Sequence, residues 1–316
     1  MSAEAVTGSQ ALSEAQAFGL LLAYCVVYVL PLHIYPAARA IPGRSRDDPA
    51  AIRARIRVVS LSTAACSLAT LLFLLAASPA EPAAEASTTM NPWRLMGYWP
   101  PGLLETAKAL ALTALLFAAP LYEHVVVDGA WSRWLHLEPL VDVWVAWPSW
   151  RNYVAGPITE ECLFRSASVP LLLSAGHTME SAVFLSPLVF GLAHVHHFYE
   201  FRQTNPQVPV IAALARSVLQ FAYTYLFGIY ATFIFLRTGS LLAVVLVHTF
   251  CNSMGLPRLW GHVEPYWYSW RELTDSTKPG PWMWTAIYYF LLFGGVMTFY
   301  RQLYLLSESP LALADF

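Results

Sequence analysis

The stretch AGPITEECLFR, residues 155–165, places two adjacent carboxylates, Glu160 and Glu161, and a cation, Arg165, inside apolar sequence. An ionisable side chain at membrane depth costs about 2.5 to 3.5 kcal/mol on insertion scales, so it usually faces a protein interior or a wet cavity and has a partner. Glu161 and Arg165 are four residues apart and are expected to pair on one helix face. Glu160 lies about 100° further round the helix. It needs another partner, so the fold must bring one to it.

The composition around this stretch is that of a membrane protein. Hydrophobic residues make up 57% of the chain and charged residues 12%, whereas about 25% of residues are charged in ordinary soluble domains. The formal net charge is -2 and there is no long basic run, so nucleic acid is not an expected partner. The sequence predicts an all-α polytopic transmembrane helical bundle that lies in the lipid bilayer.

Apolar segments of spanning length recur along the chain. Residues 130–150 differ from them, because five tryptophans alternate there with charged residues. Such a pattern favours the headgroup level and predicts an interfacial amphipathic helix. We expect about eight spans, at residues 17–35, 58–77, 103–127, 156–176, 179–199, 210–236, 241–254 and 282–304.

The loop between the first two spans is rich in arginine. By the positive-inside rule this loop is cytoplasmic, and the N-terminus is then on the other side of the membrane. We divide the chain into N-terminal transmembrane helices with this loop and the interfacial helix (1–149), a catalytic core (150–260), and a tryptophan-rich loop with the last span (261–316). The arginines of the loop are Arg39, Arg44, Arg46, Arg53, Arg55 and Arg57, against Asp47 and Asp48.

Two later segments carry polar pairs at helical spacing. Phe190 and His194 are four residues apart, as are His248 and Asn252, so each pair lies on one helix face. With Glu160 they supply a carboxylate base, an imidazole and donors for an oxyanion, which are the parts of a water-activating hydrolytic site. Each residue alone is also compatible with a simple hydrogen bond between helices.

Three other chemistries remain open. The histidines at positions 194, 196, 197 and 248 allow a zinc site, although the motif H-E-x-x-H is absent and three of them cannot converge from one helix. Cys162 is a candidate nucleophile, but a thiol in apolar surroundings is inert. A transporter would use Glu160 as a proton relay, yet no internal repeat is visible. We expect no metal and no cofactor.

The three motifs together resemble the type II CAAX prenyl endopeptidases, the Ras-converting enzyme family. They are Glu160-Glu161-x-x-x-Arg165, Phe190-x-x-x-His194 and His248-x-x-x-Asn252. The sequences FGLAHVHH (190–197) and HTFCNSMGLP (248–257) are similar to the eukaryotic branch in particular. The resemblance covers residues 150 to 260.

The resemblance implies an intramembrane endopeptidase of the endoplasmic reticulum that works without a metal. It would remove the last three residues from proteins, such as Ras-type small GTPases, whose C-a-a-X cysteine carries a farnesyl or geranylgeranyl chain. Glu160 and His194 would activate water, and His248 and Asn252 would form the oxyanion hole. Glu161, Arg165 and Phe190 would support the site or bind substrate. We expect the active site to open towards the cytoplasm and laterally to lipid. A non-catalytic membrane scaffold on the same fold and a zinc-dependent membrane protease remain the alternatives.

Overall fold

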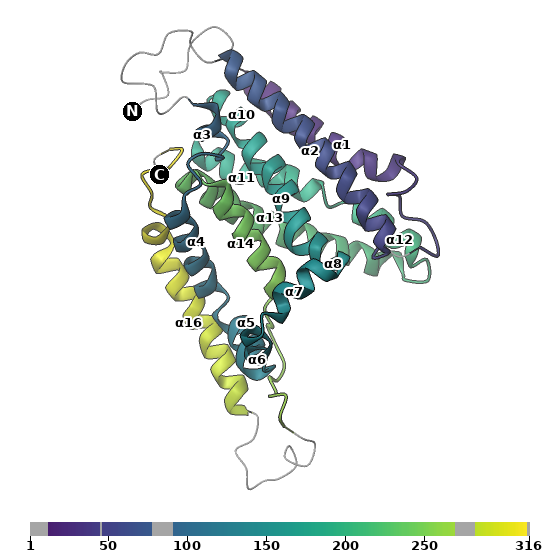
Figure 1. Cartoon of the computed structure of the whole chain (residues 1–316), viewed down its shortest axis with the longest axis vertical. Coiled ribbons are helices and arrows are strands. Elements are labelled where there is room, and N and C mark those ends of the chain that lie inside the picture. Colours follow the sequence, from purple (N-terminus) through teal and green to yellow (C-terminus); the bar gives the residue numbers. More distant parts are fainter. Residues whose placement is uncertain (1–11, 45, 78–90, 269–281, 315–316) are drawn as a thin grey trace.

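The computed structural model describes residues 12–44, 46–77, 91–268 and 282–314, and within these ranges the chain forms helices and no strand. The predicted all-α bundle is therefore confirmed. In Figure 1, α1 and α2 lie side by side along one edge, α4 and α16 along another, and α9, α13 and α14 between them.

The α-helices are α1 (Glu14–Ile34), α2 (Pro49–Ala77), α3 (Pro92–Leu95), α4 (Leu103–Leu116), α5 (Ala118–Tyr122), α6 (Trp131–Leu135), α7 (Glu138–Val145), α8 (Trp147–Trp150), α9 (Gly156–Glu161), α10 (Val169–Ser174), α11 (Met179–Leu192), α12 (His196–Thr204), α13 (Val210–Thr238), α14 (Leu241–Met254) and α16 (Trp282–Ser307). Three π-helical segments join them: η2 (Glu123–Val127), η3 (Arg151–Ala155) and η4 (Cys162–Ala167).

Fewer helices than the eight predicted spans pass a test of length and apolarity. Five helices in the described part of the chain are long and apolar enough to cross a membrane, or six if the bent pair α4 and α5–η2 is one span. The other two predicted spans are helical but shorter. Residues 156–174 divide into α9, η4 and α10, and α14 has only 14 residues.

The predicted span 103–127 bends by 83° after Leu116. Pro120 accounts for the bend, because it has no amide hydrogen to donate to the Leu116 carbonyl and its ring clashes with that group.

The predicted interfacial helix is in fact three short helices, α6, α7 and α8. Pro139 and Pro148 each stand in the first turn of a helix, where proline begins a new helix rather than continuing one. Trp131, Trp134 and Trp144 are exposed on these helices, as expected of rings at a membrane interface.

Helix α9, which carries Glu160 and Glu161, lies between two π-helical segments. Pro157 occupies the first turn of α9, and η3 and η4 lie on either side of that helix. Single π-helical turns inside α-helices often occur at functional sites. The stretch packs against α2 and α14, and side chains of η4, α10, α11, α13 and α14 form the main hydrophobic core with those of α1 and α2.

A tight turn places the last motif. Gly239 ends α13 with a left-handed φ of 58°, and the Ser240 hydroxyl then accepts a hydrogen bond of 3.0 Å from the Ala243 amide to begin α14. A Cβ atom on Gly239 would also collide with the Leu311 carbonyl. The turn directs α14 back against η3 and α9, which brings its polar residues to the central stretch.

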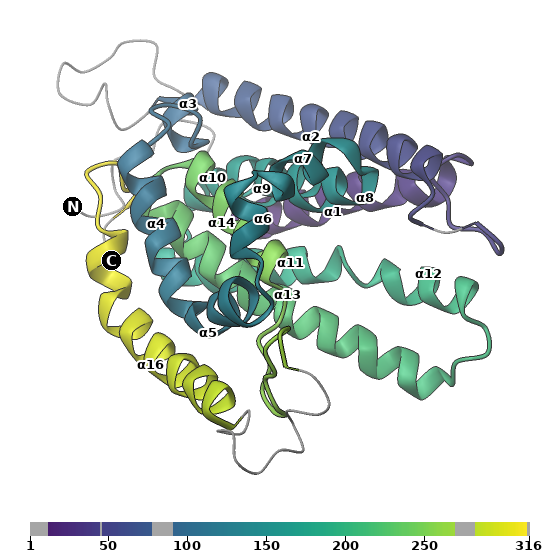
Figure 2. The ribbon, with the colours of Figure 1, turned by 60° about the horizontal axis from the view of Figure 1, so that its bottom comes forward.

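The second motif lies at a helix break. In Figure 2, α11 and α12 run beside α13, away from α4 and α16. His194 occupies the turn between α11 and α12. Its ring, at Nδ1, bonds the Phe190 carbonyl at 2.9 Å, whereas its backbone amide donates to Gly191. A side chain that takes a helical carbonyl in this way competes with the helix.

Candidate active site

Glu160 and Glu161 face opposite environments. The Glu160 side chain is 20% exposed and lines a cavity of about 160 Å³, whereas the Glu161 side chain is fully buried. Neighbouring helical residues point about 100° apart, so α9 can present one carboxylate to the cavity and the other to the core. The two glutamates therefore have different roles.

Two histidines supply the partners that Glu160 lacks on its own helix. Glu160 Oε2 lies 4.0 Å from His194 Nε2 and 3.9 Å from His248 Nε2. The second and third motifs thus both bring an imidazole close to Glu160. Both distances are too long for a direct hydrogen bond, and they suit a group that bonds to all three side chains at once.

Hydrogen bonds at the far ring nitrogens orient both imidazoles. His194 Nδ1 faces the Phe190 carbonyl and His248 Nδ1 faces Glu161 Oε1 at 2.6 Å. A carbonyl and a carboxylate only accept hydrogen bonds, so both Nδ1 atoms carry a hydrogen. With its hydrogen on Nδ1, a neutral His194 ring presents an unprotonated Nε2 to Glu160.

Glu161 and Arg165 form the predicted ion pair in the core. Arg165 Nη1 lies 3.1 Å from Glu161 Oε1, and the side chains are 0% and 1% exposed. The Arg165 guanidinium also lies 4.4 Å from the centre of the Phe190 ring. None of the three lines the cavity. Glu161 and the Phe190 carbonyl instead face the Nδ1 atoms of His248 and His194.

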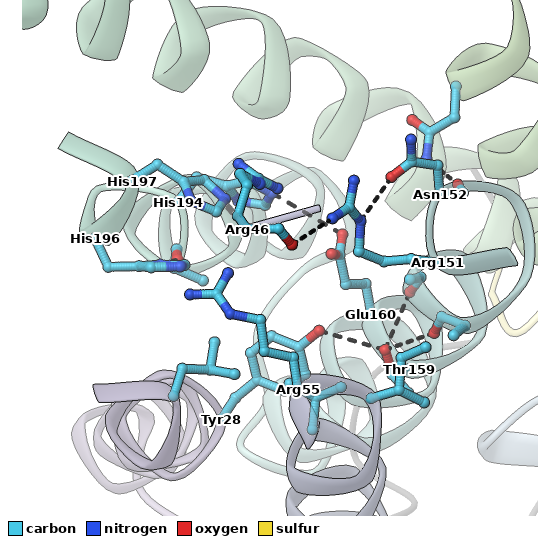
Figure 3. Close-up of a pocket in the computed structure, with 17 residues that line it drawn as sticks. Tyr28, Arg46, Arg55, Arg151, Asn152, Thr159, Glu160, His194, His196 and His197 are labelled. Carbon is cyan, nitrogen blue, oxygen red and sulfur yellow. Dashed lines mark hydrogen bonds and ion pairs between the residues drawn. The ribbon is translucent and has the colours of Figure 1, made fainter. Parts of the chain in front are cut away.

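Asn252 reaches the same cavity from the end of α14. Its amide nitrogen donates to the Asn152 carbonyl at 2.9 Å, and its side chain lines the cavity with Glu160 and His194. The bond to η3 uses one amide hydrogen and fixes the direction of the other. Asn252 is exposed, whereas His248 is 7% exposed and contacts the cavity residue Glu160 from within the core. Figure 3 shows the cavity with its labelled lining.

Three arginines at this cavity were not among the site residues predicted from the sequence. Arg46, Arg55 and Arg151 all line it. Arg46 and Arg55 are among the arginines from which the positive-inside rule predicted the membrane orientation. Nothing in their spacing along the sequence indicates a place in the site. Arg55 pairs with Glu200 through both terminal nitrogens, which attaches α2 to α12. Arg151 Nη1 lies 2.9 Å from Asp47 Oδ1.

His196 and His197 also line this cavity, and they contact other partners than Glu160. The spacing of four residues on a helix would let His196 reach Glu200, but His197 makes that bond, at 3.2 Å, while His196 Nδ1 faces the Ala193 carbonyl. The residue pattern could not distinguish them, because the break at His194 shifts the helical register. Among the described residues, the group that could hold a metal ion consists of His33, His196 and Glu200. It includes none of Glu160, His194, His248 and Asn252. The Arg55 guanidinium on Glu200 opposes a cation there.

The candidate thiol stands apart from the cavity. Cys162 is partly buried at the start of η4 and does not contribute to the lining. The structure therefore groups Glu160, His194, His248 and Asn252, and it places Cys162 elsewhere.

Known proteins resemble this chain in the region that carries the three motifs. Residues 142–254 match the family model described as "Type II CAAX prenyl endopeptidase Rce1-like". The chain is 36% identical over 278 residues to "Probable CAAX prenyl protease 2" of Schizosaccharomyces pombe, which covers 88% of this chain and 89% of that protein. It is 35% identical over 237 residues to "CAAX prenyl protease 2" of Homo sapiens, covering 69% of this chain and 66% of the human protein. A protein of the same name from Arabidopsis thaliana is 47% identical over 113 residues, 36% of either chain. No solved structure matches significantly.

Proposed function

The chain belongs to the type II CAAX prenyl endopeptidase family and is a multi-pass membrane protease that acts in CAAX processing, and on this basis we propose how it cleaves and what it cleaves. It removes the last three residues of proteins whose C-a-a-X cysteine carries a farnesyl or geranylgeranyl chain, Ras-type small GTPases among them. Water activated by Glu160 and His194 attacks the peptide bond.

The observation that carries this mechanism is the convergence on Glu160. Its Oε2 atom lies 4.0 Å from His194 Nε2 and 3.9 Å from His248 Nε2. A water held between the Glu160 carboxylate and the unprotonated Nε2 of His194 can lose its proton to Glu160 as it attacks a carbonyl. Glu160 then returns that proton to the leaving amine.

The oxyanion is stabilised from α14. His248 donates from Nε2 only when its ring carries a proton on both nitrogens, and the Glu161 carboxylate is then shared between that ring and Arg165. The free amide hydrogen of Asn252 is the second donor. Such donors act strongly because they are already aimed where negative charge develops.

Asn252→Ala is expected to lower kcat by about 10²- to 10³-fold, the usual loss when one oxyanion donor is removed. Steady-state kinetics on a prenylated peptide measures the change. Ser253→Ala, on the next residue, is the matched control, because the Ser253 hydroxyl bonds the Phe250 carbonyl of its own helix. If Asn252→Ala raised KM and left kcat unchanged, Asn252 would not stabilise the oxyanion.

The membrane location agrees with a prenylated substrate. A prenyl chain gains about 0.8 kcal/mol per buried CH2 in apolar surroundings, so an enzyme within the bilayer need not extract it. The cavity is lined by Arg46 and Arg55 of the basic loop. By the positive-inside rule this loop faces the cytoplasm, so the active site opens there, in the endoplasmic reticulum membrane.

The test is cleavage of a farnesylated C-a-a-X peptide by the purified protein in lipid-supplemented detergent, with and without a chelator. We expect release of the C-terminal tripeptide at the same rate in both samples. Chelator-sensitive cleavage would establish the zinc protease instead. A folded sample without cleavage would favour the scaffold.

A further inference from the structure

We propose that Arg46, held in place by Arg151, binds the free C-terminal carboxylate of the substrate. This inference rests on the proposed function and names the residue that makes the enzyme recognise a chain end. Recognition of the chain end would fix the cleaved bond three residues from that end. A carboxylate that leaves water for a protein cavity needs a cation or several donors to replace its hydration.

The motif arginine cannot supply that cation. Arg165 is 1% exposed, is paired with Glu161, and is absent from the cavity lining. The aromatic rings of Phe190 and Phe227 lie beside its guanidinium, at 4.4 and 5.6 Å. A substrate carboxylate would have to enter the core to reach it.

Three arginines do line the cavity, and they differ in how their charges are balanced. Both terminal nitrogens of Arg55 contact Glu200, and its Nε donates to the Ala38 carbonyl. Arg151 is paired with Asp47. Within the part of the chain that the structure describes, the guanidinium of Arg46 has no ion pair. Arg46 is therefore the arginine of this cavity whose charge is available to an incoming carboxylate.

The position of Arg46 suits the end of the substrate rather than the bond that is cut. A tripeptide spans at most about 10 Å when extended, so the carboxylate lies several ångströms from the attacking water. Glu160 is in the partly enclosed part of the cavity, whereas Arg46 is exposed. Figure 3 shows the Arg46 and Arg151 side chains together with the Glu160 carboxylate in this cavity.

Arg151 attaches the Arg46 loop to the catalytic stretch. Its Nη1 bonds the Arg46 carbonyl at 3.3 Å and Asp47 Oδ1 at 2.9 Å, while its Nε bonds Asn152 Oδ1 at 3.0 Å. Asn152 in turn accepts the bond from Asn252. A continuous set of hydrogen bonds thus links the proposed carboxylate site to the oxyanion donor, and Arg151 is a positioning residue.

The experiment compares two farnesylated peptides that differ only at the C-terminus, a free acid and a carboxamide. The wild-type protein is expected to cleave the acid with a kcat/KM about 10- to 100-fold higher, the factor expected for a hydrogen bond to a charged group. Arg46→Gln should lower kcat/KM for the acid by the same factor and leave the amide unchanged. Arg46→Lys should recover part of the preference, and Arg151→Gln should reduce it.

The control variant is Arg57→Gln, an exposed arginine of α2 outside this cavity, which should keep the acid preference. Equal cleavage of acid and amide by the wild-type protein would overturn the proposal without any variant. So would a preference that survives Arg46→Gln, or an Arg46→Gln effect of equal size on both peptides. Failure to cleave either peptide would instead contradict the proposed function.

Discussion

Glu160→Gln is expected to lower kcat by about 10²- to 10⁴-fold, the contribution of a positioned general base. Glutamine has the shape of glutamate and can still bond a water, but its amide cannot accept a proton from that water. The Glu160 side chain is 20% exposed, and its nearest polar partners are the two imidazoles. The substitution should therefore remove chemistry and leave the fold intact, since no buried ion pair is broken.

The measurement is single-turnover cleavage of the farnesylated peptide, with the thermal unfolding midpoint in detergent recorded for the same sample. Glu180→Gln is the matched control, because Glu180 is an exposed glutamate in the first turn of α11, remote in sequence from the three motifs. Normal turnover by Glu160→Gln would show that another group activates the water. Loss of turnover with a lowered midpoint would show a structural role instead.

Arg165→Met is expected to lower the free energy of unfolding by about 3 to 5 kcal/mol, because it leaves a charged carboxylate in the core without its cation. Glu161 is 0% exposed, and of its two oxygens only Oε1 has hydrogen-bond partners among the described residues. The second of these partners is His248, so the loss of Arg165 should also disturb the ring that faces Glu160.

The unfolding midpoint in detergent measures this effect, with Arg301→Met, an exposed arginine of α16, as the control. The double variant Glu161→Gln with Arg165→Met tests the cause. It removes both charges and keeps an oxygen for His248, so it should be more stable than Arg165→Met alone. A double variant that is no more stable would show that packing of the arginine against Phe190, rather than charge, sets the cost.

The sequence was a good guide wherever a local rule applied. The spacing of Glu161 and Arg165 on one helix predicted their ion pair, and the apolar composition predicted the bundle. Local rules failed at proline. Pro120 bends the third span, and Pro139 and Pro148 divide the predicted interfacial helix into three. Each proline was visible, but whether it kinks a helix or begins a new one depends on the packing around it.

By itself, the sequence determined the class of fold, the four polar residues of the candidate site and the family, because periodicity, composition and motif spacing are properties of the chain. Only the tertiary structure decided which face of α9 meets the cavity, that His197 rather than His196 pairs with Glu200, and that Arg46 joins Glu160 in one cavity. These contacts join residues more than a hundred positions apart or follow a break in helical register. No local spacing encodes them, since they depend on how separate helices pack.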